Sequence, residues 1–158
     1  MAIPKKIIKF LEKNKIKYEI IKHKIVYTAF DKAQTLKVPE KIIGKTLILK
    51  IDGELAMVLI SADRNLEINK LKKIVQKKKV ELASEKLIKN KIKGVKVGAI
   101  PPFGNLWKAQ TFIDRSLMRQ PKIIINGGDY QWSIKIKSSD FKRLIPNLII
   151  GNFSKKRK

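Results

Sequence analysis

A loop rich in glycine and proline is the stretch of this sequence best suited to hold a ligand. It reads Gly98-Ala99-Ile100-Pro101-Pro102-Phe103-Gly104. Proline lacks a backbone N–H and fixes φ, so the segment can form neither a helix nor a central strand, while glycine opens conformations that other residues avoid. We therefore expect a stiff loop that presents its few remaining N–H groups to a ligand.

Lys45 is a second candidate, in the sequence Gly44-Lys45-Thr46. A phosphate-binding P-loop ends in Gly-Lys-Ser/Thr, but it also needs a glycine at position 39, where this chain has proline, and a helix after the motif. The next residues are Leu-Ile-Leu, which favour a strand. The sequence therefore excludes a P-loop ATPase or GTPase, and leaves Lys45 as either a functional cation or one of many solvated lysines.

Conventional catalytic residues are scarce. The chain has no cysteine and one histidine, His23, so neither a thiolate nucleophile, nor a histidine-based triad, nor a multi-histidine metal site can be assembled. A single histidine is usually structural, and contact with a substrate is the other interpretation of His23. Asp63 and Asp114 are the most suggestively placed acids, but acids in a lysine-rich chain more often form surface ion pairs than catalytic dyads.

The chain is strongly basic. It has 37 Lys+Arg against 13 Asp+Glu and a formal net charge of +24, which is typical of a nucleic-acid binder. Only five of the cations are arginine, and lysine and isoleucine dominate throughout, as an AT-rich genome would encode on any surface. RNA or DNA is therefore the favoured partner, with codon bias as the competing explanation.

The length of 158 residues is enough to bury a core in one domain. We expect a single domain over residues 1–153 and a frayed basic tail over residues 154–158. The amino-terminal residues lack the uninterrupted apolar region of a secretory signal, and no apolar stretch approaches the roughly 20 residues needed to cross a bilayer. We therefore expect a soluble cytoplasmic protein with no membrane partner.

Hydrophobic spacing predicts helices interleaved with strands. The expected helices cover residues 4–14, 28–36 and 69–75, one begins after Ser84 and ends before Gly94, and the last begins at Ser139. The expected strands cover residues 18–23, 45–51, 54–60, 79–82, 109–113, 122–125 and 132–136. Asp52-Gly53 is a typical two-residue hairpin turn, and Gly127-Gly128 is a tight turn. This order of elements predicts an α+β domain with a mixed sheet.

Several of these residues together resemble a known family. They are residues 11–16, His23, Lys45-Thr46-Leu47, Asp52-Gly53, residues 66–71, the loop at 98–104, Asp114 and Gly127-Gly128. In this pattern the chain resembles the YbaK-like aminoacyl-tRNA deacylases, which share their fold with the editing domain inserted in bacterial prolyl-tRNA synthetases. The resemblance implies an α+β fold with a mixed, twisted, partly barrel-like sheet and short flanking helices.

The resemblance also implies an activity. Members hydrolyse the ester that joins a wrong amino acid to the terminal adenosine of a tRNA, with no metal, no cofactor and no protein nucleophile. By this resemblance, Lys45, Gly98 and Pro102 are the catalytic residues: N–H groups of the loop hold the ester carbonyl, as an oxyanion hole does. Lys45 neutralises the terminal phosphate or orients the acceptor end, and a ribose hydroxyl of the substrate helps to activate water.

The resemblance assigns a set of substrate-binding residues and partners. The residues are Phe30, Ala99, Ile100, Pro101, Asn126, Gly127, Ser133 and His23. The partner is the acceptor end of a tRNA, with tRNA(Pro) expected, and prolyl-tRNA synthetase is a candidate second partner.

Two positions depart from the family pattern. Cysteine-editing members carry serine where this chain has Asn126 and aspartate where it has Ser133. These departures leave the choice of substrate open. Cysteinyl-tRNA(Pro) and alanyl-tRNA(Pro) are the leading candidates that the resemblance implies, and seryl and threonyl esters are the alternatives. Two other functions remain: a non-catalytic tRNA-binding or synthetase-associated module of the same fold, and a small-molecule hydrolase that lysines merely solubilise.

Overall fold

The computed structural model describes residues 3–157. Its α-helices are α1 (Lys5–Lys13), α2 (Ala29–Leu36), α3 (Ile68–Val75), α4 (Glu85–Lys91), α5 (Arg115–Met118) and α6 (Phe141–Leu144). Its strands are β1 (Tyr18–Lys22), β2 (Gly44–Ile51), β3 (Glu54–Ser61), β4 (Arg64–Leu66), β5 (Val80–Leu82), β6 (Gln110–Asp114), β7 (Lys122–Asn126), β8 (Trp132–Lys137), β9 (Ile149–Gly151) and β10 (Ser154–Lys156). Short 3-10 helices cover Glu40–Ile42, Gly104–Trp107 and Ser138–Asp140.

The largest sheet is mixed. Its strand order is β5-β2-β3-β6-β9, in which β5, β2 and β3 pair antiparallel and β3, β6 and β9 pair parallel. A second sheet, β1-β8-β7, is antiparallel, and a third joins β10 to β4. The prediction of an α+β fold with a mixed sheet is confirmed, although the described strands form three open sheets rather than a closed barrel.

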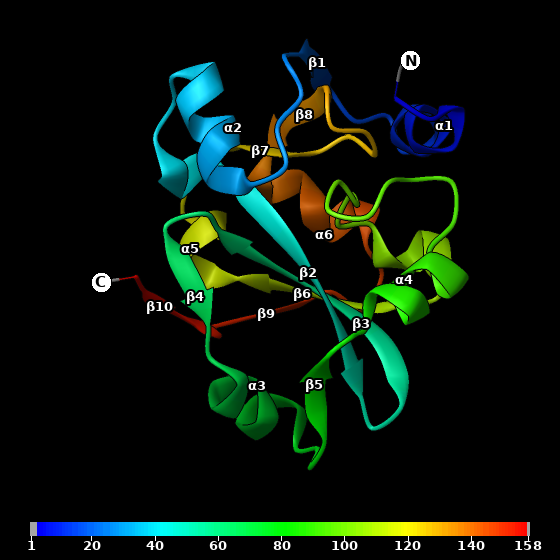
Figure 1. The fold of residues 1–158 in the computed structure, drawn as a ribbon, viewed down its shortest axis with the longest axis vertical. Helices are drawn as coiled ribbons and strands as arrows, with labels where there is room; N and C mark the ends of the chain where they lie inside the picture. The colour runs from blue at the N-terminus through cyan, green and yellow to red at the C-terminus, as the bar shows by residue number, and fades with distance from the viewer. Residues whose placement is uncertain (1–2, 158) are drawn as a thin grey trace.

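The β2–β3 hairpin forms the central ribbon of the molecule (Figure 1). Asp52 and Gly53 both have positive φ, 46° and 85°, as the mirror-image turn of a two-residue hairpin requires. Because side chains alternate along a strand, Leu47 and Leu49 pack on one face, whereas Ile48 packs on the other face with Ile100. Figure 1 shows α2 near the start of β2 and α3 near its far end.

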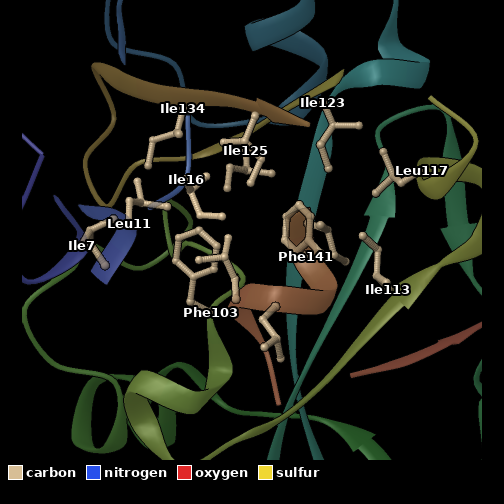
Figure 2. Close-up of a cluster of buried hydrophobic side chains, with 14 of the residues drawn as sticks. Ile7, Leu11, Ile16, Phe103, Ile113, Leu117, Ile123, Ile125, Ile134 and Phe141 are labelled. Carbon is tan, nitrogen blue, oxygen red and sulfur yellow. The ribbon is translucent and has the colours of Figure 1, made fainter. Parts of the chain in front are cut away.

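The main core fixes the glycine- and proline-rich loop. Phe103, at the end of that loop, is fully buried, and its ring lies 5.1 Å from that of Phe10 and 6.2 Å from that of Phe141. Figure 2 shows Phe103 beside Leu11 and Ile16. Apolar burial of this kind anchors the loop as a fixed part of the domain.

The carboxyl-terminal residues correct one prediction. Residues 154–156 are not a frayed tail but strand β10, in which Ser154 pairs with Leu66 and is fully buried. Phe153 is also fully buried and packs against Phe112, so the core holds the segment in place. No helix between residues 3 and 157 combines the length and apolar composition that crossing a bilayer requires.

Candidate functional site

A pocket of about 240 Å³ brings together residues from four distant parts of the chain. Its lining comprises four groups of residues: Val26, Tyr27, Thr28, Ala29 and Lys32 from the segment before α2 and its first turn, Lys45 and Thr46 from β2, Gly98 and Ala99 from the loop, and Asn126, Asp129 and Tyr130 from the end of β7 and the turn after it. A larger, open cavity of about 730 Å³ lies beside Trp107 and Asn147 and contains none of the predicted site residues.

The loop is held through its carbonyl groups. The donors are the Tyr130 hydroxyl to Val97 O (2.5 Å), the Gly128 N–H to Ala99 O (2.8 Å) and the Asn126 side-chain amide to Ile100 O (3.2 Å). The Gly127-Gly128 turn therefore supports the loop. Gly128 also has a φ of +95°, and a Cβ there would come within about 3.0 Å of Pro4, so this position requires glycine.

The N–H groups of the loop are left largely free. Gly98 is exposed and has a φ of +87°, a conformation that other residues rarely adopt. The Ala99 N–H donates to Lys96 O at 3.0 Å, and Pro101 and Pro102 have no N–H. The Gly104 N–H donates to Thr111 Oγ1, whereas among residues 3–157 the N–H groups of Gly98, Ile100 and Phe103 have no hydrogen-bond acceptor. Phe103 is fully buried in the core, so the loop offers the donors of Gly98 and Ile100, and a bound oxygen would satisfy them.

Lys45 contributes to the pocket lining but has charged neighbours outside it. Its β2 position places it on the sheet face of Leu47, opposite to Thr46. Burial lowers the pKa of Lys45, Arg157 lowers it further, and Asp63 and Glu40 oppose the shift. No hydrogen bond or ion pair of its ammonium group is found within the described part of the chain. Lys45 is therefore an unpaired cation at the edge of the pocket.

Lys32 is the lysine that the sequence analysis missed. It is only 6% exposed, lines the pocket, and donates from Nζ to Asn126 Oδ1 at 2.7 Å. Burial lowers its pKa to about 8. A signal was present in the sequence: Lys32 interrupts the apolar stripe formed by Ala29, Ala33 and Leu36 on α2.

His23 and Ser133 form a hydrogen-bonded pair outside the pocket lining. The His23 Nε2 lies 2.9 Å from Ser133 Oγ, and its Nδ1 lies 2.8 Å from Lys24 O. Since a carbonyl can only accept, Nδ1 carries the proton, and the Ser133 hydroxyl donates to Nε2. Burial lowers the pKa of His23, the Lys24 carbonyl opposes this, and the charge of Lys32 lowers it further. Ser133 pairs across the sheet with Asn126, which joins this pair to the pocket.

The structure does not bring all predicted site residues into the pocket. Lys45, Gly98, Ala99 and Asn126 line it together. The residues outside its lining are Phe30, Ile100, Pro101, Pro102, Gly127, Ser133 and His23. Phe30 is 46% exposed, whereas the two prolines of the loop are buried. The prolines therefore shape the backbone rather than form the wall of this pocket.

Two tyrosines stand at the mouth of the pocket. The ring of Tyr27, which is 68% exposed, meets that of Tyr130 edge-on, with 4.9 Å between ring centroids. The ammonium of Lys96 lies 5.4 Å from the Tyr130 ring and 3.2 Å from Asp129 Oδ2. Burial raises the pKa of Asp129, but the hydrogen bond and charge of Lys96 together with the Gln131 N–H outweigh it, so the pKa is lowered and this carboxylate is charged. The mouth thus combines aromatic surface with a cation.

Known proteins with similar sequences are proline–tRNA ligases. That of Caldicellulosiruptor bescii is 31% identical over 99 residues, which are 62% of this chain and 17% of the ligase. That of Staphylococcus saprophyticus is 39% identical over 77 residues, or 49% of this chain and 13% of the ligase. The chain therefore matches less than a fifth of each of these relatives.

Solved structures share the whole fold. A hypothetical protein superposes with a TM-score of 0.85 and 23% identity, covering 95% of this chain and 99% of that protein. A proposed trans-editing enzyme for prolyl-tRNA synthetase superposes with a TM-score of 0.80 and 18% identity, covering 98% and 96%. The sequence model of the aminoacyl-tRNA editing domain matches residues 23–144, a span that includes every residue of the pocket. This chain therefore belongs to the family of aminoacyl-tRNA editing domains.

Proposed function

We propose that this chain is an aminoacyl-tRNA deacylase that acts in trans, hydrolysing the ester of a mischarged tRNA. The observation that carries the proposal is the pair of free N–H groups, on Gly98 and Ile100, in a loop that borders a cation-lined pocket. Such donors stabilise the negative charge that develops on an ester oxygen during hydrolysis. Membership of the editing-domain family supports the same reaction.

The proposed reaction adds water to the ester. The carbonyl oxygen accepts from the loop donors while the oxygen of water attacks the carbonyl carbon. The bond between that carbon and the ribose oxygen then breaks, and the ribose oxygen takes a proton that the water supplied. A neighbouring ribose hydroxyl of the substrate helps to activate the water, and the protein contributes chiefly by positioning.

Lys45 is suited to hold the acceptor end where it enters the pocket. Its ammonium is unpaired within the described residues and lies at the edge, where the phosphate of the terminal nucleotide would pass. The net charge of +24 attracts the rest of the tRNA. Tyr27 and Tyr130 offer aromatic surface on which the terminal adenine can stack.

The size of the pocket favours a small amino acid. A volume of about 240 Å³ lies below the roughly 300 to 1,000 Å³ typical of sites for drug-sized ligands. We propose tRNA(Pro) as the carrier, with cysteine, alanine, serine and threonine as the small amino acids whose size suits this volume. Prolyl-tRNA synthetase is the proposed source of these mischarged tRNAs.

Replacing Lys45 with alanine tests the proposed phosphate contact. The variant should lose about tenfold in kcat/KM on mischarged tRNA(Pro), mainly through KM, because a charge-assisted contact to the substrate is removed. Lys41→Ala, which removes an exposed lysine nearby, is the matched control. Wild-type kcat/KM in Lys45→Ala would contradict the assigned role.

Replacing Gly98 with valine tests the loop donors. Valine should strain the left-handed backbone at a cost of about 1 to 2 kcal/mol and displace the N–H groups, lowering kcat by about a hundredfold. Gly94→Val is the control, because Gly94 has a similar φ of +88° and open space around it but lies outside the pocket. The two variants should lose similar stability, and equal activities would count against the oxyanion hole.

A non-catalytic module of the same fold is the rival function. Asn126 favours it, because its side-chain oxygen accepts from Lys32 and its side-chain nitrogen donates to Ile100 O, so both atoms already have a partner within the protein. Under this rival, the protein would bind tRNA with a steep salt dependence but leave every aminoacyl ester intact. Incubation with a panel of mischarged tRNAs, scored for ester loss, separates the two functions.

A further inference from the structure

The inner part of the pocket contains a cation with unused donors. An ammonium group carries three N–H donors, and among the described residues Lys32 uses one of them, to Asn126 Oδ1. No carboxylate lies within ion-pairing distance of Lys32 in residues 3–157. The Asn126 amide cannot turn away, because its nitrogen donates to Ile100 O. The ammonium group of Lys32 is therefore held in place, and its other N–H donors remain available to a ligand.

Thr46 supplies a second unsatisfied group beside the same pocket. Its Oγ1 is buried and has no hydrogen-bond partner within the described chain. Alternation along β2 places Thr46 on the face of Ile48, which packs against Ile100 of the loop. A buried hydroxyl without a partner is costly, so an occupant of the pocket that bonds to it would be favoured.

We propose that Lys32 and Thr46 select an aminoacyl group whose small side chain carries a hydroxyl, so that seryl and threonyl esters react ahead of alanyl and cysteinyl esters. The inference rests on the proposed deacylase function. Lys32 donates to the hydroxyl oxygen, and Thr46 Oγ1 accepts the hydroxyl proton. An aliphatic side chain offers neither contact and leaves both protein groups unpaired, which is how polar sites reject apolar analogues.

The electrostatics of the pocket support this role for Lys32. Its pKa of about 8 keeps the ammonium mostly protonated at neutral pH, so that it remains a donor. The titratable groups around it are His23, whose pKa its charge lowers, and Asp129, which is paired with Lys96. Neither His23 nor Asp129 makes a hydrogen bond or ion pair with Lys32 within residues 3–157, so their acceptors do not occupy its free donors.

The test compares seryl, threonyl, alanyl and cysteinyl esters on one tRNA(Pro) transcript. Wild-type protein should hydrolyse the seryl and threonyl esters about tenfold or more faster than the alanyl ester. Lys32→Met keeps the length of the side chain but removes its donors, and should bring this ratio close to one by slowing the hydroxyl-bearing esters. Lys37→Met removes an exposed lysine at the end of the same helix and should leave the ratio unchanged.

Thr46→Val provides a second variant with a distinct signature. Removing an unpaired buried hydroxyl should leave the melting temperature unchanged or higher, while the preference for the seryl over the alanyl ester falls. A residue with only a structural role would not change selectivity in this way.

The outcomes separate this inference from the function on which it rests. An alanyl or cysteinyl ester that reacts faster than the seryl ester, or a ratio that Lys32→Met leaves intact, would overturn the selectivity alone. Failure to hydrolyse any ester in the panel would overturn the deacylase function and the selectivity together.

Discussion

Two buried polar clusters in this molecule differ in how many of their hydrogen-bonding groups have a partner within the protein. Around Asp114, which is 1% exposed, the carboxylate accepts from the Phe153 N–H at 2.8 Å, from the Ser154 hydroxyl at 2.9 Å and from both the N–H and the hydroxyl of Ser116. Arg64 adds an ion pair at 3.9 Å. In the pocket, by contrast, Lys32 makes one hydrogen bond and Thr46 Oγ1 makes none within the described residues.

The contrast indicates which cluster serves structure and which serves binding. Asp114 caps α5 and holds the carboxyl-terminal segment, so its carboxylate oxygens are hydrogen-bonded to groups of the protein itself. Buried polar groups that stay unpaired reduce stability and are retained where a ligand completes them. The following variants test this distinction.

Asp114→Ala should have the largest effect on stability, a loss of about 3 to 5 kcal/mol, because it leaves the Phe153 N–H and the Ser154 hydroxyl buried without their acceptor. Urea denaturation measures this loss. Glu85→Ala, which removes an exposed ion pair with Lys89, should cost no more than about 0.5 kcal/mol. A similar small cost for Asp114→Ala would show that the two clusters do not differ as described.

Lys32→Met should change how stability depends on pH. The pKa of Lys32 is about 8 in the folded chain against an ordinary value of 10.5, so between these values the unfolded chain holds a proton that the folded chain has released. Stability from this group therefore rises with pH through that window, by at most about 1.4 kcal/mol per pH unit. Urea denaturation of wild type, Lys32→Met and Lys37→Met across the window should show this rise missing only in Lys32→Met. If the free energy of unfolding depended on pH in the same way in all three proteins, the lowered pKa of Lys32 would be contradicted.

Ser154→Ala should have a smaller effect than Asp114→Ala, a loss of about 1 kcal/mol, because it removes one satisfied hydroxyl from the Asp114 cluster. The matching deletion in the pocket, Thr46→Val, should cost nothing. Thermal unfolding of the two variants compares the loss of a hydrogen-bonded hydroxyl with the loss of an unpaired one. An equal loss of stability in both would contradict the difference between the two clusters.

Local signals explain why much of the fold could be predicted. Thr28 accepts from the Asp31 N–H and Ser84 from the Leu87 N–H, as helix-capping residues do, and Asp52-Gly53 forms the expected turn. Strands β4, β9 and β10 were missed, since such short segments carry little periodicity. Long-range pairing creates them, because β4 pairs with β10 and β9 pairs with β6.

The candidate site was predicted only in part. Sequence pattern and family resemblance pointed to Lys45 and to the loop, and both line the pocket. Lys32 was missed because its interruption of the apolar stripe on α2 is a weak signal in so lysine-rich a chain, and only the structure shows that it is buried. Tyr27 and Thr46 were missed for the same reason, since their positions depend on how α2 and β2 pack together.

The sequence by itself determined the conformations that depend on neighbouring residues, such as the left-handed turn at Gly98 and the rigid backbone at Pro101 and Pro102, because steric limits on φ act locally. Only the tertiary structure decided which side chains meet. Lys32 and Asn126 are 94 residues apart, and their 2.7 Å contact exists because packing of α2 against the end of β7 excludes the water that would otherwise solvate the lysine.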